Sequence, residues 1–151
     1  VMYSYLGLAL GDFSSGFISQ RMQSRKKVVL LYIFLTLIFF IFYLYLPVHT
    51  SAFFYTACFL LGFGIGYWAL FVTIAAEQFG TDIRSTVATT VPNFIRGTVV
   101  PITFAFKMLR DAYGIINGAL LVGLLTIVVA LFALKLIGET FATDLNYVEE
   151  D

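Results

Sequence analysis

Gly62-Phe63-Gly64-Ile65-Gly66-Tyr67-Trp68 alternates glycines with large side chains inside an apolar span, and Glu77-Gln78-Phe79-Gly80-Thr81-Asp82-Ile83-Arg84 ends that span with a charged segment. A helix that only faces lipid requires neither feature. Together they indicate a membrane helix that does more than anchor the chain.

The composition places most of the chain outside water. Of 151 residues, 60% are hydrophobic and 12% are charged, whereas soluble domains average about 25% charged residues. The 17 Phe and 9 Tyr are too many for a soluble core of this size. Nine basic residues balance nine acidic ones, so no nucleic-acid partner is expected. The single cysteine, Cys58, can form no disulfide within the chain.

Apolar spans of the right length recur along the sequence. A membrane-crossing helix needs about 20 apolar residues, and residues 28–76 contain no Asp, Glu, Lys or Arg. This stretch fits two crossings, with a reversal at Pro47-Val48-His49-Thr50-Ser51. We therefore predict an all-α membrane protein: a bundle over residues 1–137, then an acidic tail over 138–151. Its five helices are expected at about 2–20, 28–46, 51–76, 85–106 and 113–134.

The basic residues predict an orientation. Short cytoplasmic loops are rich in Lys and Arg. One side of the predicted bundle carries six such residues: Arg21, Arg25, Lys26, Lys27, Arg84 and Lys135. The other side carries Lys107 and Arg110. We therefore expect the amino terminus outside and the carboxyl tail in the cytoplasm.

The five predicted spans differ in polarity. Residues 28–46 and 113–134 are nearly uniformly apolar and are expected to face lipid. The other three contain Asp12, the glycine run, and Arg96 with Asn93. Ionisable groups at bilayer depth usually face a bundle interior or a wet cavity, so these three spans should face something polar.

Asp12 and Arg96 are the intramembrane charges. Asp12 lies nine residues before Arg21, or about 13 Å along a helix. Ser15, Gly16 and Ser19 share its helical face. Either Asp12 locks helices together, or it has a cavity or coupling role.

Arg96 lies twelve residues after Arg84, about 18 Å in from the same side, between Pro92 and Pro101. Each proline frees a backbone carbonyl and can bend the helix. A buried guanidinium needs an anion, so we expect Arg96 to pair with Asp12 or to receive an anionic substrate. A permanent structural ion pair is an equal alternative.

Glycines and aromatics suggest further roles. Small residues four apart let helices approach closely, and such pairs are Gly7 with Gly11, Gly62 with Gly66, and Gly114 with Gly118. For Gly7 and Gly114, plain packing is expected. Tyr67 and Trp68 could stack on a substrate, and His49 is expected to be a polar loop residue. No nucleophile triad, phosphate loop or metal cluster is visible, so no enzyme activity, cofactor or metal is expected.

Three stretches resemble the carboxyl-terminal half of a major facilitator superfamily transporter. Gly16 to Lys27 is similar to its cytoplasmic loop motif, with Gln20 where Asp is usual. Gly64 to Arg84 is similar to the tenth helix and following loop of sugar-porter-like members, with Gly80 in place of Pro.

The third stretch lies at the end of the chain. Gly138-Glu139-Thr140-Phe141, with Leu145 and Val148-Glu149-Glu150, is similar to the Pro-Glu-Thr-Lys-Gly ending and acidic tail of those members, with Gly138 in place of Pro.

The resemblance assigns the spans to helices eight to twelve of a twelve-helix, two-bundle fold. There the ninth and twelfth helices are peripheral, in agreement with the two apolar spans. It also implies a cytoplasmic gate network, which comprises Arg21, Arg25, Lys26, Glu77, Arg84 and Glu139.

The function expected from this resemblance is secondary transport of a small hydrophilic metabolite by alternating access in the plasma (bacterial inner) membrane. The expected substrate-binding or coupling residues are Asp12, Tyr67, Trp68, Asn93 and Arg96. Trp68 suggests a sugar or polyol, and Arg96 suggests an organic anion. If Asp12 titrates, the carrier is a proton symporter.

A non-transporting membrane module, such as a receptor, an assembly partner or an inactive transporter fragment, is the alternative. The chain begins at Val1 rather than Met, which suggests a piece of a longer protein. The expected partners are lipid, the upstream helices of the transporter, a small solute and protons. We expect the 151 residues alone to be inactive in transport.

Overall fold

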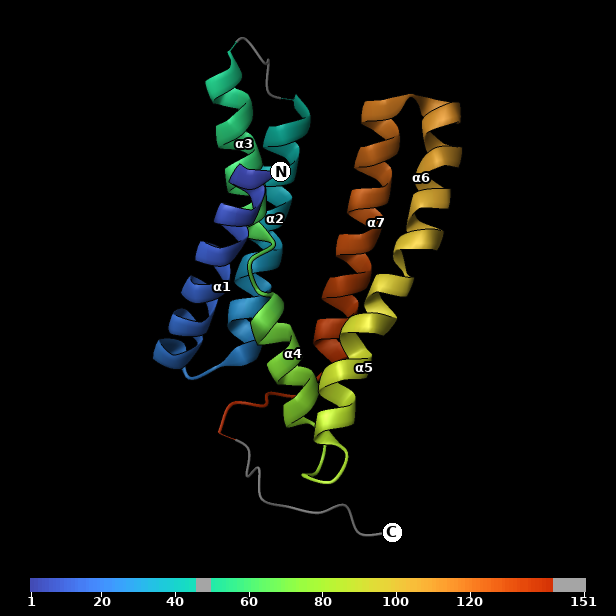
Figure 1. The fold of residues 1–151 in the computed structure, drawn as a ribbon. Helices are drawn as coiled ribbons and strands as arrows, with labels where there is room; N and C mark the ends of the chain where they lie inside the picture. The colour runs from blue at the N-terminus through green and yellow to red at the C-terminus, as the bar shows by residue number, and fades with distance from the viewer. Residues whose placement is uncertain (46–49, 143–151) are drawn as a thin grey trace.

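A computed structural model of the chain describes residues 1–45 and 50–142. This part is all-helical and contains no strand (Figure 1). Its helices are α1 (Met2–Met22), α2 (Arg25–Tyr45), α3 (Ser51–Gly64), α4 (Trp68–Glu77), α5 (Arg84–Gly97), α6 (Val99–Tyr113) and α7 (Ile115–Leu136). Five helical spans were predicted, and two of them are broken, into α3 with α4 and α5 with α6. The predicted reversal at Pro47, Val48 and His49 lies outside the described residues, as do Leu145 and the acidic end of the tail.

Three stretches of the described residues are long and apolar enough to cross a membrane. They are Arg25–Tyr45, Ser51–Glu77 and Ile115–Leu136. Successive spans run in opposite directions, with α3 and α4 forming one span and α5 and α6 another. The α1–α2 turn, the α4–α5 turn and the end of α7 therefore lie at one end of the molecule (Figure 1). The α6–α7 turn lies at the opposite end. The helix ends that carry most of the basic residues therefore share one end.

The break between α5 and α6 falls at Thr98, three residues before Pro101. Proline lacks the N–H that would bond the carbonyl four residues earlier, and its ring crowds that carbonyl. The carbonyl in question belongs to Gly97, the last residue of α5. At the break itself, Thr98 donates its N–H to Ile95 O at 3.0 Å, the tighter turn with which α5 ends.

The fourth span is longer than predicted. Helix α6 continues to Tyr113, so Lys107 and Arg110 lie in its last turns and not in a loop. Gly114 alone separates α6 from α7, with φ 84° and ψ 169°. A side chain added at Gly114 would meet nothing within 4 Å. Gly114 is therefore a turn glycine, and the expectation that it packs two helices together is wrong.

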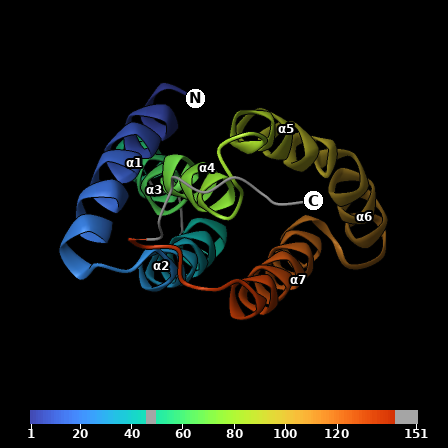
Figure 2. The same ribbon diagram turned by 90° about the horizontal axis from the view of Figure 1, so that it is seen from below.

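Two groups of helices make up the bundle (Figure 2). Helices α1, α2 and α3 pack together, and α6 pairs with α7. Helix α4 also contacts α1 and α2 of the first group, and α5 contacts α6 of the second. The contacts of α4 with α5, and of α2 with α7, join the two groups. Helix α4 lies between α1 and α5, which do not contact each other.

Small residues line the face that α1 buries. The buried residues of α1 are Gly7, Gly11, Ser15 and Ser19, each four positions from the next. A Cβ added at Gly7 would overlap the backbone carbonyl of Phe59, and one at Gly62 would overlap the carbonyl of Ser4. The glycines of both helices therefore lie where two backbones meet.

The hydrophobic core surrounds the first turns of α2. Val28, Val29, Tyr32 and Ile33 of this helix pack with Leu70 and Ile74 of α4 and Leu134 of α7. The expectation that residues 28–46 face lipid is therefore wrong for the first half of α2, although Ile38, Ile41 and Phe42 farther along are exposed. Lipid tails are as apolar as leucine, so an apolar sequence does not distinguish a lipid neighbour from a protein neighbour.

Candidate functional site

The candidate site is the break in the third span, between Gly64 and Trp68. The backbone makes a tight turn there, with Gly66 N bonded to Phe63 O at 3.0 Å and Tyr67 N to Ile65 O at 2.9 Å. Any helix end leaves backbone carbonyls or N–H groups without partners inside the helix. A break inside an apolar span therefore exposes polar groups of α3 and α4 among apolar neighbours.

Side chains from two other helices bind these exposed groups. Thr36 Oγ1 of α2 lies 2.7 Å from Gly64 O at the end of α3. It also lies 2.8 Å from Tyr32 O, so its single hydrogen is shared between two carbonyls. Asp12 Oδ1 of α1 accepts the N–H of Ala69, at the start of α4, at 3.1 Å. A carboxylate is favourable there because helix N-termini carry partial positive charge.

The glycine run brings these partners together. A Cβ added at Gly66 would overlap Gly11 Cα, next to Asp12. One added at Gly64 would lie 3.1 Å from Thr36 Cα. Each polar contact across the break thus sits beside a close backbone approach that a larger residue would prevent.

Asp12 and Arg96 do not pair, so the expected ion pair between them is wrong. Arg96 Nη1 donates to Asn93 Oδ1 at 3.1 Å, and both residues are exposed on α5. Asp12 instead binds the start of α4, which lies between α1 and α5 (Figure 2). Similar depth along the bundle did not place the two side chains on facing surfaces.

Tyr67 and Trp68 lie at a different cavity. Tyr67 is half-buried, with its ring edge-on to Tyr32 at 6.2 Å, and Trp68 packs against Phe71 at 5.7 Å. Both border an apolar cavity of about 640 Å³ that Ile95 and α7 also line.

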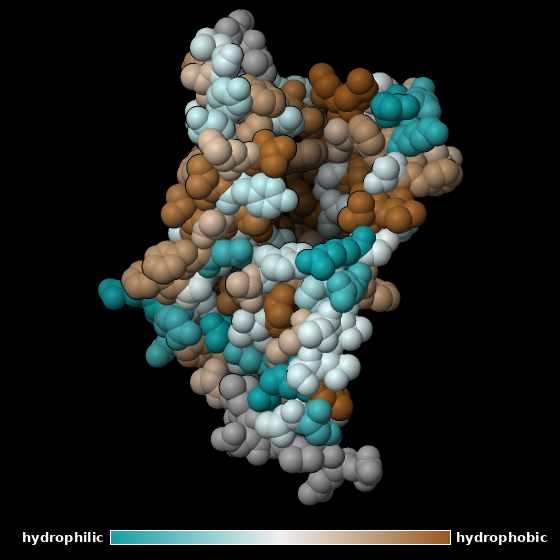
Figure 3. Space-filling view, in the orientation of Figure 1, coloured by the Kyte–Doolittle hydropathy of each residue, from teal (hydrophilic) through white to brown (hydrophobic). Residues whose placement is uncertain are grey.

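Asp12 lines a separate groove of about 470 Å³ between α1 and α4. The structure therefore does not gather the five predicted substrate residues in one place. On the face in Figure 3, hydrophobic atoms surround a hollow in the upper part, and hydrophilic atoms collect toward the end where α4 and α5 meet.

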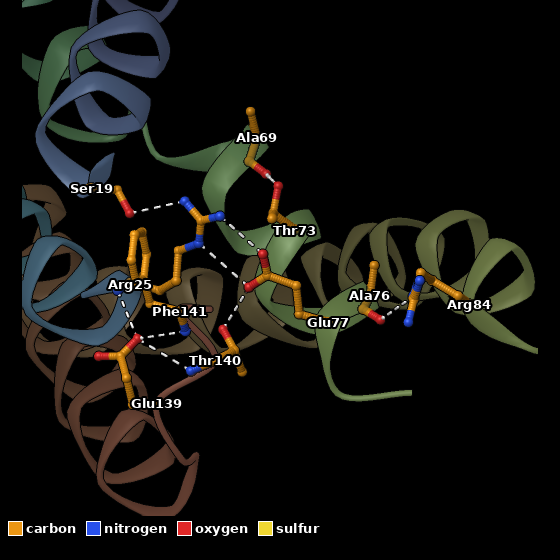
Figure 4. A network of polar contacts seen from close by, with 10 residues as sticks. All are labelled: Ser19, Arg25, Ala69, Thr73, Ala76, Glu77, Arg84, Glu139, Thr140 and Phe141. Carbon is orange, nitrogen blue, oxygen red and sulfur yellow. Dashed lines mark hydrogen bonds and ion pairs between the residues drawn. The ribbon is translucent and has the colours of Figure 1, made fainter. Parts of the chain in front are cut away.

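A polar network ties α1, α2 and α4 at one end of the bundle (Figure 4). Arg25 and Glu77 form an ion pair at 2.9 Å, with side chains only 13% and 11% exposed. Arg25 Nη1 also donates to Ser19 Oγ at 3.1 Å. Thr140 Oγ1, from the segment after α7, donates to Glu77 Oε2 at 2.7 Å.

Glu139 binds the start of α2. Its carboxylate accepts the N–H of Arg25 at 2.8 Å, the N–H of Lys26 at 3.4 Å and the hydroxyl of Ser24. Burial alone would raise the pKa of this carboxyl, but the hydrogen bonds from Ser24, Arg25, Phe141 and Lys26 outweigh burial and lower the pKa below its usual 4.5. Lys26 Nζ also donates to Ile137 O at 2.7 Å.

The two remaining members of the predicted gate network lie apart from this cluster. Arg84 donates to Ala76 O at 3.3 Å and to Phe79 O at 3.1 Å, so it binds the backbone at the end of α4. Arg21 is exposed, and its side chain has no hydrogen bond or ion pair within the described residues. Of the six predicted residues, the structure brings together Arg25, Lys26, Glu77 and Glu139.

Sequence reasoning missed the hydroxyl groups that complete both sites. Thr36 was visible as the one hydroxyl, besides those of the tyrosines, in the otherwise apolar span of residues 28–46. Ser24 accepts the N–H of Lys27 at 3.3 Å, as a helix N-cap does, and a serine before a helix is a readable signal. Thr140 gave no such signal.

No metal site accompanies these features: within residues 1–45 and 50–142, no three His, Cys, Asp or Glu side chains lie close enough to share an ion. Comparison of the chain with protein-family models, curated proteins and solved structures finds no match.

Proposed function

We propose that this chain is the carboxyl-terminal part of a major facilitator superfamily transporter, a multi-pass membrane protein that carries a small hydrophilic solute by alternating access. One observation carries the proposal: the span Ser51–Glu77 is broken at Ile65–Tyr67, and its exposed ends are bound by Asp12 and Thr36. Secondary transporters build their sites near the midplane from such discontinuous helices. A helix that only anchors a protein has no need of a break.

Helix α4 is suited to couple the break in the third span to the polar network around Glu77. It is ten residues long, or about 15 Å. Asp12 holds its first turn, and Arg25 holds its last residue, Glu77. This ion pair is largely buried, and a buried charge left without its partner is costly. The contact at Glu77 can therefore break as α4 tilts only if the same movement brings water to both charges.

Asp12 is the coupling residue in this scheme. Protonation removes the negative charge that favours its bond to Ala69 N–H, because charge-assisted hydrogen bonds are roughly twice as strong as neutral ones. A protonated Asp12 therefore holds α4 more weakly. Proton binding and movement of α4 become linked, which is what proton-coupled transport requires.

The test is uptake by the intact transporter in proteoliposomes under an imposed pH gradient. Asp12→Asn should abolish proton-driven accumulation and retain solute exchange, whereas Asp111→Asn, the same change on α6, should alter neither. Unchanged accumulation in Asp12→Asn refutes the coupling role. If the intact protein moves no sugar, polyol, organic anion or organic cation, transport itself is refuted in favour of a non-transporting module.

Two further variants divide the expected substrate classes. Trp68 borders the apolar cavity beside the break, and Arg96 lies on the exposed face of α5. Loss of uptake in Trp68→Ala with normal uptake in Arg96→Gln would exclude an organic anion held by Arg96. The reverse pattern would exclude a sugar stacked on Trp68.

A further inference from the structure

The groove between α1 and α4 has the features of a ligand site, and Asp12 is the one residue of its lining that the sequence indicated as a binding residue. Its volume of about 470 Å³ lies within the usual range for small-molecule pockets. One wall is formed by Asp12, Gly16 and Gln20, which follow one another at four-residue intervals on α1. The other wall is formed by Ala69, Leu70 and Thr73 of α4.

The charge of the groove is negative where Asp12 lies. Only one oxygen of the Asp12 carboxylate accepts the N–H of Ala69, so the other can accept a second partner. The groove also contains Arg25, but its guanidinium is bound to Glu77 and Ser19. Ser19, which the Arg25 guanidinium contacts, lies seven residues beyond Asp12 on α1. The positive charge of Arg25 is therefore separated from the negative charge of Asp12 by about 10 Å along the helix.

Aromatic rings lie beside the carboxylate. Phe13 and Phe17 line the groove from α1 and are highly exposed, at 77% and 65%. Between them, Gly16 leaves the groove open, because a Cβ there would meet nothing within 4 Å. A carboxylate in a groove that aromatic rings also line is suited to attract organic cations, since the ring faces carry negative electrostatic potential.

We infer that this groove binds an organic cation, with the ammonium group against Asp12 and its alkyl groups against Phe13 and Phe17. Gln20 supplies an amide for any polar group at the far end. The claim that this cation is a transported substrate rests on the proposed transport function. The claim that the groove binds a cation does not depend on that function.

The experiment measures binding of radiolabelled tetraethylammonium to the purified protein by equilibrium dialysis in a non-ionic detergent. Asp12→Asn removes the charge, while its amide oxygen can still accept the bond from Ala69. Gly16→Leu fills the groove without changing any charge, and Phe17→Leu removes one ring. Asp111→Asn is the matched control, because Asp111 pairs with Arg110 on α6, away from the groove.

Wild type and Asp111→Asn should bind tetraethylammonium saturably and alike. Asp12→Asn should weaken binding at least about tenfold, Phe17→Leu about two- to fivefold, and Gly16→Leu should abolish it. Unlabelled tetraethylammonium should compete, whereas sorbitol and glutarate should not.

The inference is overturned by a lack of saturable binding, by equal binding in Gly16→Leu and wild type, or by competition from sorbitol or glutarate. Saturable cation binding without uptake in proteoliposomes would refute transport and leave the site. Uptake of a neutral solute without cation binding would refute the site and leave transport.

Discussion

Replacing Gly11 by alanine tests whether the close approach of α1 and α3 sustains the fold. The added Cβ would lie 2.5 Å from Phe63 O and 2.8 Å from Gly66 Cα, whereas ordinary contacts begin at 3.4 Å. Both neighbours are backbone, so no side chain can rotate away. The two helices must separate by about 1 Å, which weakens dispersion contacts along their whole interface. Overpacking of this kind costs about 1–3 kcal/mol.

The matched control lies on the same helix. A Cβ at Gly16 meets nothing within 4 Å, so Gly16→Ala should be neutral or stabilising by up to about 1 kcal/mol, because alanine favours helix. The free energy of unfolding of both variants would be measured by denaturant titration in micelles, followed by the helix signal in circular dichroism. Equal stability of Gly11→Ala and Gly16→Ala would refute the close packing.

Three further predictions use the same measurement. Glu77→Gln should lower the free energy of unfolding by about 1–3 kcal/mol, because it leaves the charge of Arg25 without its partner in a largely buried site. Asp111→Asn, at an exposed ion pair, should lower it by under about 1 kcal/mol. Similar losses in the two variants would contradict the structural importance of the network. The pKa of Glu139 is lowered on folding, so its contribution is complete above about pH 4.5 and is lost as the pH falls through the lower folded-state pKa. Glu139→Gln should therefore flatten the acid limb of the stability curve, and an unchanged limb would show that its hydrogen bonds do not favour the charged form. Gly114→Ala should cost about 1–3 kcal/mol from backbone strain alone, whereas Gly138→Ala, also in open space but without a positive φ, should cost little.

The helical spans could be predicted because span length and apolar composition are local properties of the sequence. All five predicted starts lie within three residues of a helix start in the structure. The breaks inside two spans were less predictable, although Pro101 and the glycine run marked both places. Their locations depend on which backbone groups a neighbouring helix can bind.

The partners of the charged residues could not be predicted from depth alone. The sequence predicts comparable depth for Asp12 and Arg96, yet α4 separates the helices that carry them. The position of a residue along a helix says how deep it lies but not which neighbour it faces. The contact between Arg25 and Glu77 was accessible only through the resemblance, since 52 positions separate them in sequence.

The proposal of alternating access at the groove between α1 and α4 is most directly tested by labelling a single cysteine there from each side of the membrane. Thr73 lines the groove, and Thr73→Cys would be placed in the intact protein with Cys58 replaced by alanine. Lys107→Cys, near the far end of α6, is the control and should react from one side only. A membrane-impermeant maleimide should label Thr73→Cys from both sides of proteoliposomes, in proportions that the transported solute changes. Labelling of Thr73→Cys from one side only, with and without solute, would contradict alternating access.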